Sequence, residues 1–316
     1  MRGHARDIRG SVGLLTTSIL LGACGGWGDD LVTVEHLPLT TPVGADATLH
    51  IESSDRFLIG EPGQLRRVEP GATVATFTIA DIATPYVIAV LDDGIVVHAG
   101  DRLLRLSPDG ELMNAEDDME ESLFAMDPRG RWIVQAAGSG AVFGHSTATL
   151  TPVWGWASLG ERTTGFAVSP HGGTVVQAIP GELLIRDLQT GRTLETMEVA
   201  APFRQLTSAG SGRIYGIGGT EGRATVFAVQ MAGEEPSILW RRTLDDLDLG
   251  EDAEVRLSPI GDRLVVFAPG KKGGLRMLDA ETGEALGSIL EGPIDVGYGP
   301  GGHLFMLYPG AIRKLR

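Results

Sequence analysis

Residues 255–290 read VRLSPIGDRLVVFAPGKKGGLRMLDAETGEALGSIL, and this stretch decides the fold. It contains three short apolar runs and a weaker fourth, separated by SPIG, PGKKGG and DAETG. Each separator supplies the Gly, Pro or Asp that tight turns require, so the stretch predicts four consecutive antiparallel strands. One such sheet cannot bury both of its faces, whereas copies packed around a common axis can. The rest of the chain should therefore contain further copies of this unit.

The turn between the first and second strands of the unit recurs along the chain. Its closing glycine stands at positions 94, 130, 172, 212, 261 and 302, and the intervals run from 36 residues (94 to 130) to 49 (212 to 261). An earlier unit has Ser53-Ser54-Asp55 in the same place, which makes seven units with a period near that of a propeller blade. The sequence thus predicts an all-β fold over residues 31–316, a single seven-bladed β-propeller of four-stranded antiparallel blades. Six or eight blades stay open as alternatives, because the longest interval contains a long loop.

The two ends of the predicted propeller complement each other. The last unit stops at AIRKLR, residues 311–316, without an outer strand, while LVTVEHL at 31–37 is strand-like but belongs to no unit. Lending the N-terminal run to the last unit would complete that blade and remove an exposed sheet edge. We therefore expect the N-terminal strand to close the ring.

Two short motifs resemble those of known bacterial propellers. They are the SPxG turns and LDAETG at 278–283, to which DLQTG at 187–191 is a weaker match. They resemble the YVTN, WD-repeat-like and quinoprotein-like families, and the resemblance covers nearly all of residues 31–316. It implies the fold but no particular activity, and the absence of a regular Trp-Asp dipeptide and of a repeated outer-strand Trp leaves the family open. The chain is also similar in plan to the barrel-assembly lipoprotein of the outer membrane, a lipid anchor that carries a propeller, but differs in predicted blade count and in that Trp pattern.

The first 24 residues have the features of an export signal. Arg2, Arg6 and Arg9 precede an uncharged, mainly apolar segment at 10–20, which is too short to span a bilayer. The following Leu-Gly-Ala-Cys at 21–24 resembles the bacterial lipobox, in which the cysteine is acylated, and Cys24 is the only cysteine of the chain. We predict a lipoprotein signal peptide at 1–23, lipidation of Cys24 and a Gly-rich linker at 24–30. A plain secretory signal cut near Ala23 is the alternative.

This predicted processing leads to expectations about location and partners. Removing residues 1–23 would take away three arginines and one aspartate, so the net charge would move from −15 to −17. A net negative charge of this size argues against nucleic acid as a partner, because nucleic-acid binding depends on neutralisation of the phosphates by Lys and Arg. A glycine at position 25, directly after the cysteine, resembles the pattern in lipoproteins that are released to the outer membrane. We expect an exported monomer, held by its lipid at the periplasmic side or the cell surface, on the outer rather than the inner membrane.

Motifs of the common enzyme classes are absent from the sequence. It contains no GxSxG, HExxH, GxxxxGK[ST] or CxxC. The histidines are scattered, and His50, in a predicted inner strand that could face the channel, is expected to be a hydrogen-bonded structural residue. The single asparagine, Asn114, falls in a predicted outer strand or loop, which argues against a metal-dependent lactonase. The sequence therefore predicts no catalytic, cofactor-binding or metal-binding residue.

Two acidic clusters are the candidate interaction sites. Both fall in connections from an outer strand to the next inner strand, and hence on one face of the predicted ring. They consist of Glu116, Asp117, Asp118, Glu120 and Glu121, and of Asp245, Asp246, Asp248, Glu251, Asp252 and Glu254. The candidate roles are solvated loops, a Ca²⁺ loop at 246–252, which lacks the Asp-x-Asp-x-Asp-Gly order, and a docking face for a basic envelope protein.

The function expected from these features is that of a lipid-anchored, non-enzymatic protein-interaction scaffold on the cell envelope. The alternative is a propeller-type hydrolase or lyase, such as a sugar lactonase, that acts in the central channel.

Overall fold

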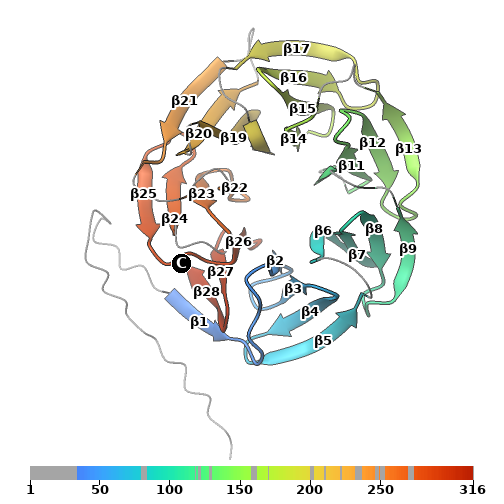
Figure 1. The fold of residues 1–316 in the computed structure, drawn as a ribbon, viewed down its shortest axis with the longest axis vertical. Coiled ribbons are helices and arrows are strands. Elements are labelled where there is room, and N and C mark those ends of the chain that lie inside the picture. Colours follow the sequence, from blue (N-terminus) through green and yellow to red (C-terminus); the bar gives the residue numbers. More distant parts are fainter. Residues whose placement is uncertain are drawn as a thin grey trace, which may run out of the picture.

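The computed structural model is a ring of seven four-stranded antiparallel sheets around a central channel (Figure 1). It describes residues 34–79, 84–117, 119, 122–127, 130–157, 162–169, 171–199, 203–209, 211–220, 223–231, 237–245, 249, 253–269 and 274–315. Within these residues there is no helix, so none that could cross a membrane. The predicted all-β, seven-bladed propeller is confirmed, and the six- and eight-bladed alternatives are wrong.

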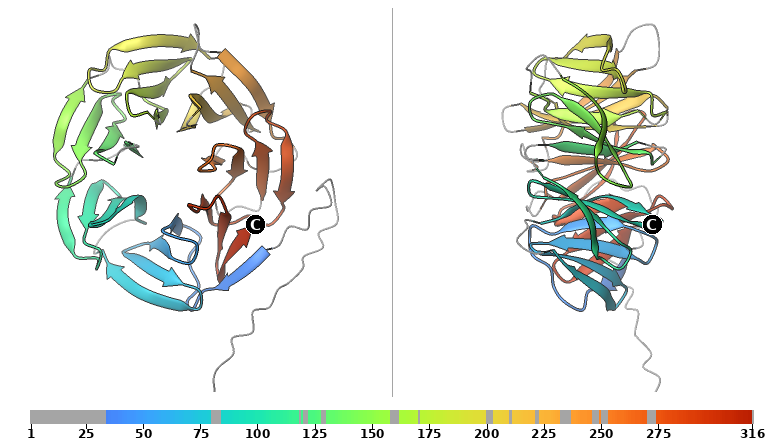
Figure 2. Two further views of the ribbon diagram at one scale, coloured as in Figure 1. Left: turned by 180° about the vertical axis from the view of Figure 1, so that it is seen from behind. Right: turned by 90° about the vertical axis from the view of Figure 1, so that its right-hand side faces the viewer.

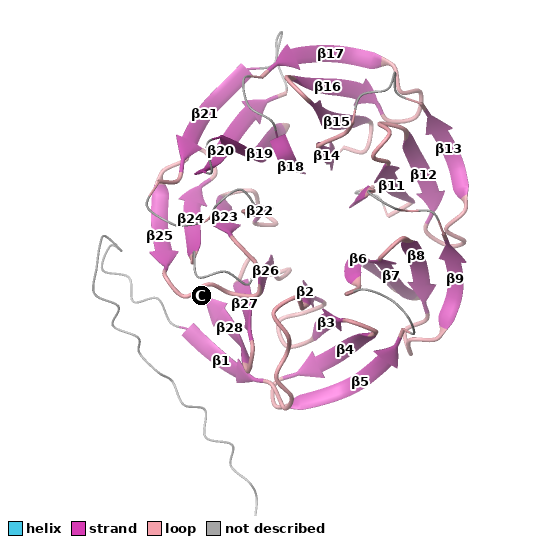
Figure 3. Ribbon diagram, in the orientation of Figure 1, coloured by secondary structure: helices cyan, strands magenta, loops and turns pink. Residues whose placement is uncertain are grey.

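Each blade takes its strands from consecutive residues, ordered from the channel outward (Figure 3). Blade 1 consists of β2 (Thr48–Ile51), β3 (Phe57–Glu61), β4 (Gln64–Glu69) and β5 (Ala72–Thr78), and blade 2 of β6 (Tyr86–Leu91), β7 (Gly94–Ala99), β8 (Arg102–Leu106) and β9 (Leu112–Glu116). Blade 3 consists of β10 (Leu123–Met126), β11 (Trp132–Ala136), β12 (Val142–Ser146) and β13 (Pro152–Trp156), and blade 4 of β14 (Gly165–Val168), β15 (Thr174–Ile179), β16 (Glu182–Asp187) and β17 (Thr193–Glu198). Blade 5 consists of β18 (Phe203–Ser208), β19 (Arg213–Thr220), β20 (Arg223–Gln230) and β21 (Ser237–Thr243), and blade 6 of β22 (Glu254–Leu257), β23 (Arg263–Phe267), β24 (Leu275–Asp279) and β25 (Ala285–Ile289). Blade 7 consists of β26 (Asp295–Tyr298), β27 (Leu304–Tyr308), β28 (Ala311–Leu315) and the N-terminal strand β1 (Val34–Pro38).

The N-terminal strand closes the ring, as expected. β1 pairs antiparallel with β28, from Val34 opposite Leu315 to Pro38 opposite Ala311. Leu37 enters a buried cluster with Phe57 of blade 1 and with Phe305 and Ile312 of blade 7. Closure thus supplies both the outer strand of blade 7 and part of the packing between the last blade and the first.

The core lies between the blades rather than inside one compact centre. In the second strand β23, for example, Leu264, Val265, Val266 and Phe267 are all buried, and alternate side chains enter the packing toward the two neighbouring blades. Both faces of a middle strand therefore need apolar side chains, which explains its continuous apolar run. The outer strands are the exception: β13, β17 and β21 each keep an apolar side chain exposed, namely Val153, Leu194 and Ile238.

The DxxTG motif builds the turn between the third and fourth strands in blades 4 and 6. In blade 4 the carboxylate of Asp187 accepts hydrogen bonds from the backbone N–H and the hydroxyl of Thr190, at 2.8 and 2.7 Å, and these bonds lower the pKa of Asp187. Gly191 then adopts φ 68°, a left-handed backbone conformation that L-residues disfavour. Asp279, Thr282 and Gly283 repeat this arrangement in blade 6.

Each of these turns carries a tryptophan from the outer strand of the preceding blade. Trp156 of β13 packs on Gly191 and donates its indole N–H to the carbonyl of Leu188, at 3.2 Å. Trp240 of β21 packs on Gly283 and donates to Ala280 in the same way, at 3.3 Å. The expectation that the chain has no repeated outer-strand Trp is therefore wrong. The two tryptophans share a role but lie 84 residues apart (156 to 240), two blades apart, so no short spacing reveals them.

Candidate functional site

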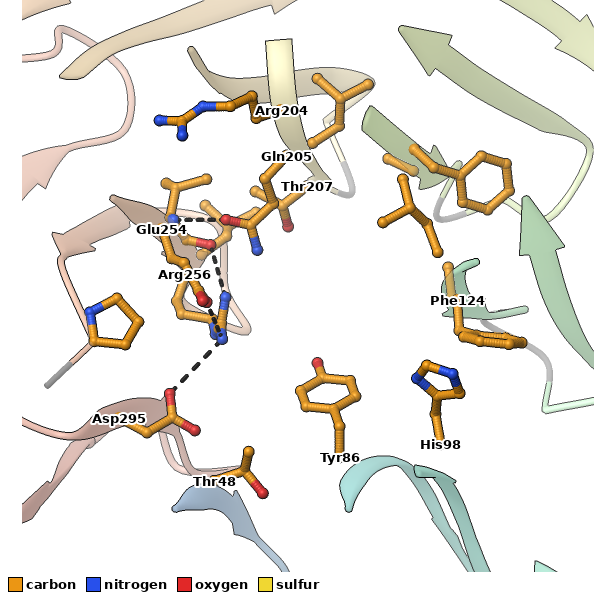
Figure 4. A pocket seen from close by; sticks show the side chains of 18 of the residues that line it. Thr48, Tyr86, His98, Phe124, Arg204, Gln205, Thr207, Glu254, Arg256 and Asp295 are labelled. Atoms are coloured by element: carbon orange, nitrogen blue, oxygen red, sulfur yellow. Dashed lines mark hydrogen bonds and ion pairs between the residues drawn. The ribbon is translucent and has the colours of Figure 1, made fainter. Parts of the chain in front are cut away.

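The central channel holds a cavity of about 960 Å³ to which all seven inner strands contribute. Its two sides differ in polarity (Figure 4). On one side β10 and β14 present an apolar wall that includes Leu123, Phe124, Met126, Phe166 and Val168. The remaining inner strands contribute Thr48, Tyr86, Arg204, Gln205, Thr207, Glu254, Arg256 and Asp295. The cavity is therefore amphipathic, and of a volume that suits a small organic ligand.

A three-residue charge cluster dominates the polar side. The guanidinium of Arg256 lies 2.6 Å from a carboxylate oxygen of Glu254 and 3.7 Å from one of Asp295. The Arg256 side chain remains 23% exposed, toward the channel, whereas that of Asp295 is only 9% exposed. Glu254 and Arg256 come from blade 6 and Asp295 from blade 7, so the cluster bridges two blades.

Asp295 also connects the last blade to the first. Its two carboxylate oxygens accept backbone hydrogen bonds from Leu49 of β2 and from Val296, both at 2.7 Å. Burial raises the pKa of Asp295 to about 6, against the lowering effects of Arg256 and of these two N–H groups. Burial also acts to lower the pKa of Arg256, but the charges of Glu254 and Asp295 more than offset it, so that Arg256 stays charged.

Asp295 should make the stability of the protein depend on pH. Its folded-state pKa, about 6, lies above the ordinary 3.8, so the carboxyl contributes stability that is fully present below about pH 4 and is lost as the pH rises through 6. The Asp295→Asn variant should lack this contribution. From pH 4 to pH 7 the unfolding free energy of the wild type should fall by on the order of 2 kcal/mol relative to the variant. Urea unfolding of both proteins at pH 4, 5, 6 and 7 measures this, and a wild-type-to-variant difference that is constant over that range would contradict it.

Two inner strands contain an extra residue beside the cavity. In β18, Phe203 pairs with Gly218 and Gln205 with Ile217, so Arg204 is the extra residue of a β-bulge. In β6 the corresponding irregularity lies between Val87 and Ala89, directly after Tyr86, which is 46% exposed and projects into the channel (Figure 4). Bulges of this kind commonly re-aim side chains at functional sites. The other bulges of the described residues lie between third and outer strands, away from the channel.

Arg204 differs from Arg256 in its surroundings. Two of its guanidinium nitrogens, Nε and Nη2, are buried and find no hydrogen-bond partner among the described residues. Unsatisfied donors of this kind typically cost about 1–3 kcal/mol each. Its neighbour Gln205 is engaged, since its side-chain oxygen accepts the backbone N–H of Val255 at 2.8 Å. That bond joins β18 and β22 at the residues that follow Arg204 and Glu254.

The cavity extends to one face of the ring. Residues of the connections from outer to inner strands line it, namely Asp46, Ser122, Ala253 and Ile294, whereas none of the described turns between first and second strands does. The two acidic clusters fall in connections of the same type, between β9 and β10 and between β21 and β22. The side view shows the ring edge-on as a disc, with loops at both of its faces (Figure 2).

The structure places four of the eleven predicted acidic residues. Asp117 pairs with Arg102 at 2.8 Å, Asp245 with Arg223 at 3.0 Å, and Glu116 is the last residue of β9. Glu254 is not in a solvated loop but begins inner strand β22 and lines the cavity. Asp118, Glu120, Glu121, Asp246, Asp248, Glu251 and Asp252 lie outside the described residues, as does Cys24. The docking role of these clusters therefore stays a prediction.

The other single residues weighed from the sequence do not line the cavity. Asn114 is in outer strand β9 and donates to the carbonyl of Ala148 at 3.2 Å. His50 is in inner strand β2 but is not among the residues that line the cavity, and burial lowers its pKa. The described residues contain no group of three or more His, Cys, Asp and Glu side chains that could hold a metal ion.

Sequence reasoning missed Tyr86, Arg204, Arg256 and Asp295. They lie in four different blades, so no local spacing connects them. The available signal was a charged residue inside a short inner strand, as in EVRL at 254–257 and DVGY at 295–298.

Known structures share the fold. A chain of Kuenenia stuttgartiensis hydrazine synthase superimposes with a TM-score of 0.67 over 89% of this chain and 96% of that chain. The two are 14% identical in sequence, so the likeness shows the propeller fold alone. No protein-family model and no curated protein matches the chain.

Proposed function

We propose that this protein is an exported, lipid-anchored β-propeller that acts as a non-enzymatic interaction scaffold on the cell envelope. The observation that carries the proposal is that several polar groups of the channel already form hydrogen bonds and ion pairs with one another and with the backbone. Asp295 is held by two backbone N–H groups and faces Arg256, Glu254 pairs with Arg256, and the Thr48 hydroxyl donates to the carbonyl of Pro85 at 2.7 Å. These groups hold neighbouring blades together, which suits a rigid binding ring better than a site that must exchange protons with a substrate.

The proposed anchor would orient the ring. Val34, at the start of β1, lies opposite Leu315, which pairs with Leu304 beside the turn between β26 and β27. The chain thus enters on the face opposite to the mouth of the cavity. Residues 24–33 extend to about 35 Å at most, so a lipid on Cys24 would keep the entry face near the membrane. The cavity mouth and the acidic connections would then face away from it and be accessible to a partner.

The scaffold proposal is tested by affinity capture from envelope extracts. Full-length protein should retain a stoichiometric partner, and neutralising Glu116, Asp117 and Asp245 should abolish retention because the docking charges are lost. A matched variant with Glu195 and Glu198 of outer strand β17 neutralised should retain the partner. Cys24→Ser should move the protein from the membrane to the soluble fraction. Equal retention by both charge variants, or membrane association without Cys24, would refute the corresponding part of the proposal.

A hydrolase or lyase acting in the channel, such as a sugar lactonase, is the second candidate. The observation that favours it is Asp295, a carboxyl group with a raised pKa beside a guanidinium in an open cavity. Turnover of a panel of sugar lactones, lost in both Asp295→Asn and Glu254→Gln, would establish it. Inactivity of the wild type on the panel would count against it.

A further inference from the structure

The charged groups that line the channel cavity are of both signs. Arg204 and Arg256 share it with Glu254 and Asp295, and Asp46 adds a carboxylate at the mouth. A purely anionic ligand would be repelled by these carboxylates, and a purely cationic ligand by the two guanidinium groups. An uncharged apolar ligand would displace water from all of these groups without replacing its hydrogen bonds. A ligand with one charge of each sign avoids these three costs.

The opposite wall of the cavity selects for an apolar group on the same ligand. Phe124 and Phe166 stand there together with Leu123 and Met126, and Phe124 is braced by the ring of His98 at a centroid distance of 4.7 Å. The side chains of Leu123, Phe124 and Met126 are only partly buried, because they border the open channel. A ligand side chain placed against them would bury additional apolar surface, which is favourable.

We infer that the channel cavity binds a zwitterionic α-amino acid or dipeptide with an apolar side chain, with its carboxylate on Arg204 and its ammonium on Glu254. A carboxylate matches the planar donors of a guanidinium, and Arg204 is the cavity arginine that forms no ion pair with a described carboxylate, whereas Arg256 is paired with Glu254 and Asp295. The side chain of Glu254 is 36% exposed, so an ammonium group can reach it. The Gln205–Val255 hydrogen bond holds the two charged residues on joined strands.

Calorimetric titration of the full-length protein tests the assignment, with L-phenylalanine and L-leucyl-L-phenylalanine as probes. At least one of them should bind. 3-Phenylpropionate, which lacks the ammonium, phenethylamine, which lacks the carboxylate, and glycine, which lacks the apolar group, should bind at least tenfold more weakly. Arg204→Gln and Glu254→Gln should each weaken the best probe by roughly 10- to 100-fold, as expected for the loss of a hydrogen bond to a charged group.

Controls separate this role from a loss of folding. Arg204→Lys should restore part of the affinity, because it returns the charge without the planar donors. Arg56→Gln, which removes an exposed arginine paired with Glu69 outside the cavity, should bind like the wild type. The far-ultraviolet circular dichroism spectrum of each variant should match that of the wild type. The inference is overturned if neither zwitterion binds at millimolar concentration, if phenethylamine or 3-phenylpropionate binds as tightly, or if folded Arg204→Gln retains full affinity.

Discussion

Replacing Gly191 by alanine is expected to lower the free energy of unfolding by about 2–4 kcal/mol. Gly191 has φ 68°, which costs an L-residue about 1–2 kcal/mol. A Cβ at this position would also clash with the indole ring of Trp156. Displacing the ring removes its packing between blades 3 and 4 and its hydrogen bond to Leu188. Urea unfolding followed by circular dichroism measures the change.

Gly181 provides the matched control in the same blade. It has φ 87°, in the turn between β15 and β16, but a Cβ there would meet no atom within 4 Å. Gly181→Ala should therefore lower the free energy of unfolding only by the cost of the left-handed backbone conformation, about 1–2 kcal/mol. Gly283→Ala should behave like Gly191→Ala, because its Cβ would lie 2.7 Å from the ring of Trp240. Equal losses in Gly181→Ala and Gly191→Ala would show that the tryptophan contact contributes nothing.

The second large effect is expected at the closure of the ring. Leu37 of β1 lies opposite Ile312 of β28 and is 6% exposed, in a cluster shared by blades 1 and 7. Leu37→Asp would place an unpaired carboxylate in this cluster, at a cost of about 4 kcal/mol or more. Because detaching β1 also exposes the edge of β28, the variant should aggregate. Urea unfolding and size-exclusion chromatography measure the two effects.

Milder substitutions test whether closure depends on this pair. Leu37→Ala and Ile312→Ala should each cost about 2–4 kcal/mol, and the double variant should lose at least about 0.5 kcal/mol less than their sum, because the two side chains are in contact. Glu35→Ala, on the same strand, removes a partly exposed carboxylate 3.8 Å from Lys314 and should cost under about 1 kcal/mol. Additive effects at positions 37 and 312, or a Glu35→Ala loss as large as that of Leu37→Ala, would contradict this account of closure.

The sequence predicted the ring because its determinants are local. Turns such as Ser258-Pro259-Ile260-Gly261 require particular residues at adjacent positions, and Gly261 indeed adopts φ 76°. A strand buried on both faces requires a continuous apolar run, as in β23. The missing outer strand of the last blade and the unassigned strand-like run at the N-terminus predicted the pairing of β1 with β28. Each of these inferences rests on a few neighbouring residues, and the regular period of the repeat shows that the separate stretches are copies of one unit.

The cavity depends on residues that no short stretch contains. Arg204, Glu254, Arg256 and Asp295 come together only because blades 5, 6 and 7 present their inner strands to one axis. The acidic pattern that includes Glu254 was visible in the sequence, but its position in an inner strand rather than in a solvated loop was not. The bulge at Arg204 depends on pairing with β19, which a strand pattern does not show.

The sequence by itself predicted a propeller of seven blades, with six or eight left open, the order of its strands and the closure of the ring, because turn chemistry and apolar runs act over distances of a few residues. Only the tertiary structure decided which polar side chains meet in the channel and which tryptophan packs on which glycine. Apart from Glu254 with Arg256, those contacts join residues about 30 to 250 positions apart, such as Trp156 with Leu188 and Leu49 with Asp295. Their geometry is set by the packing of whole blades against one another, and no local residue preference encodes it.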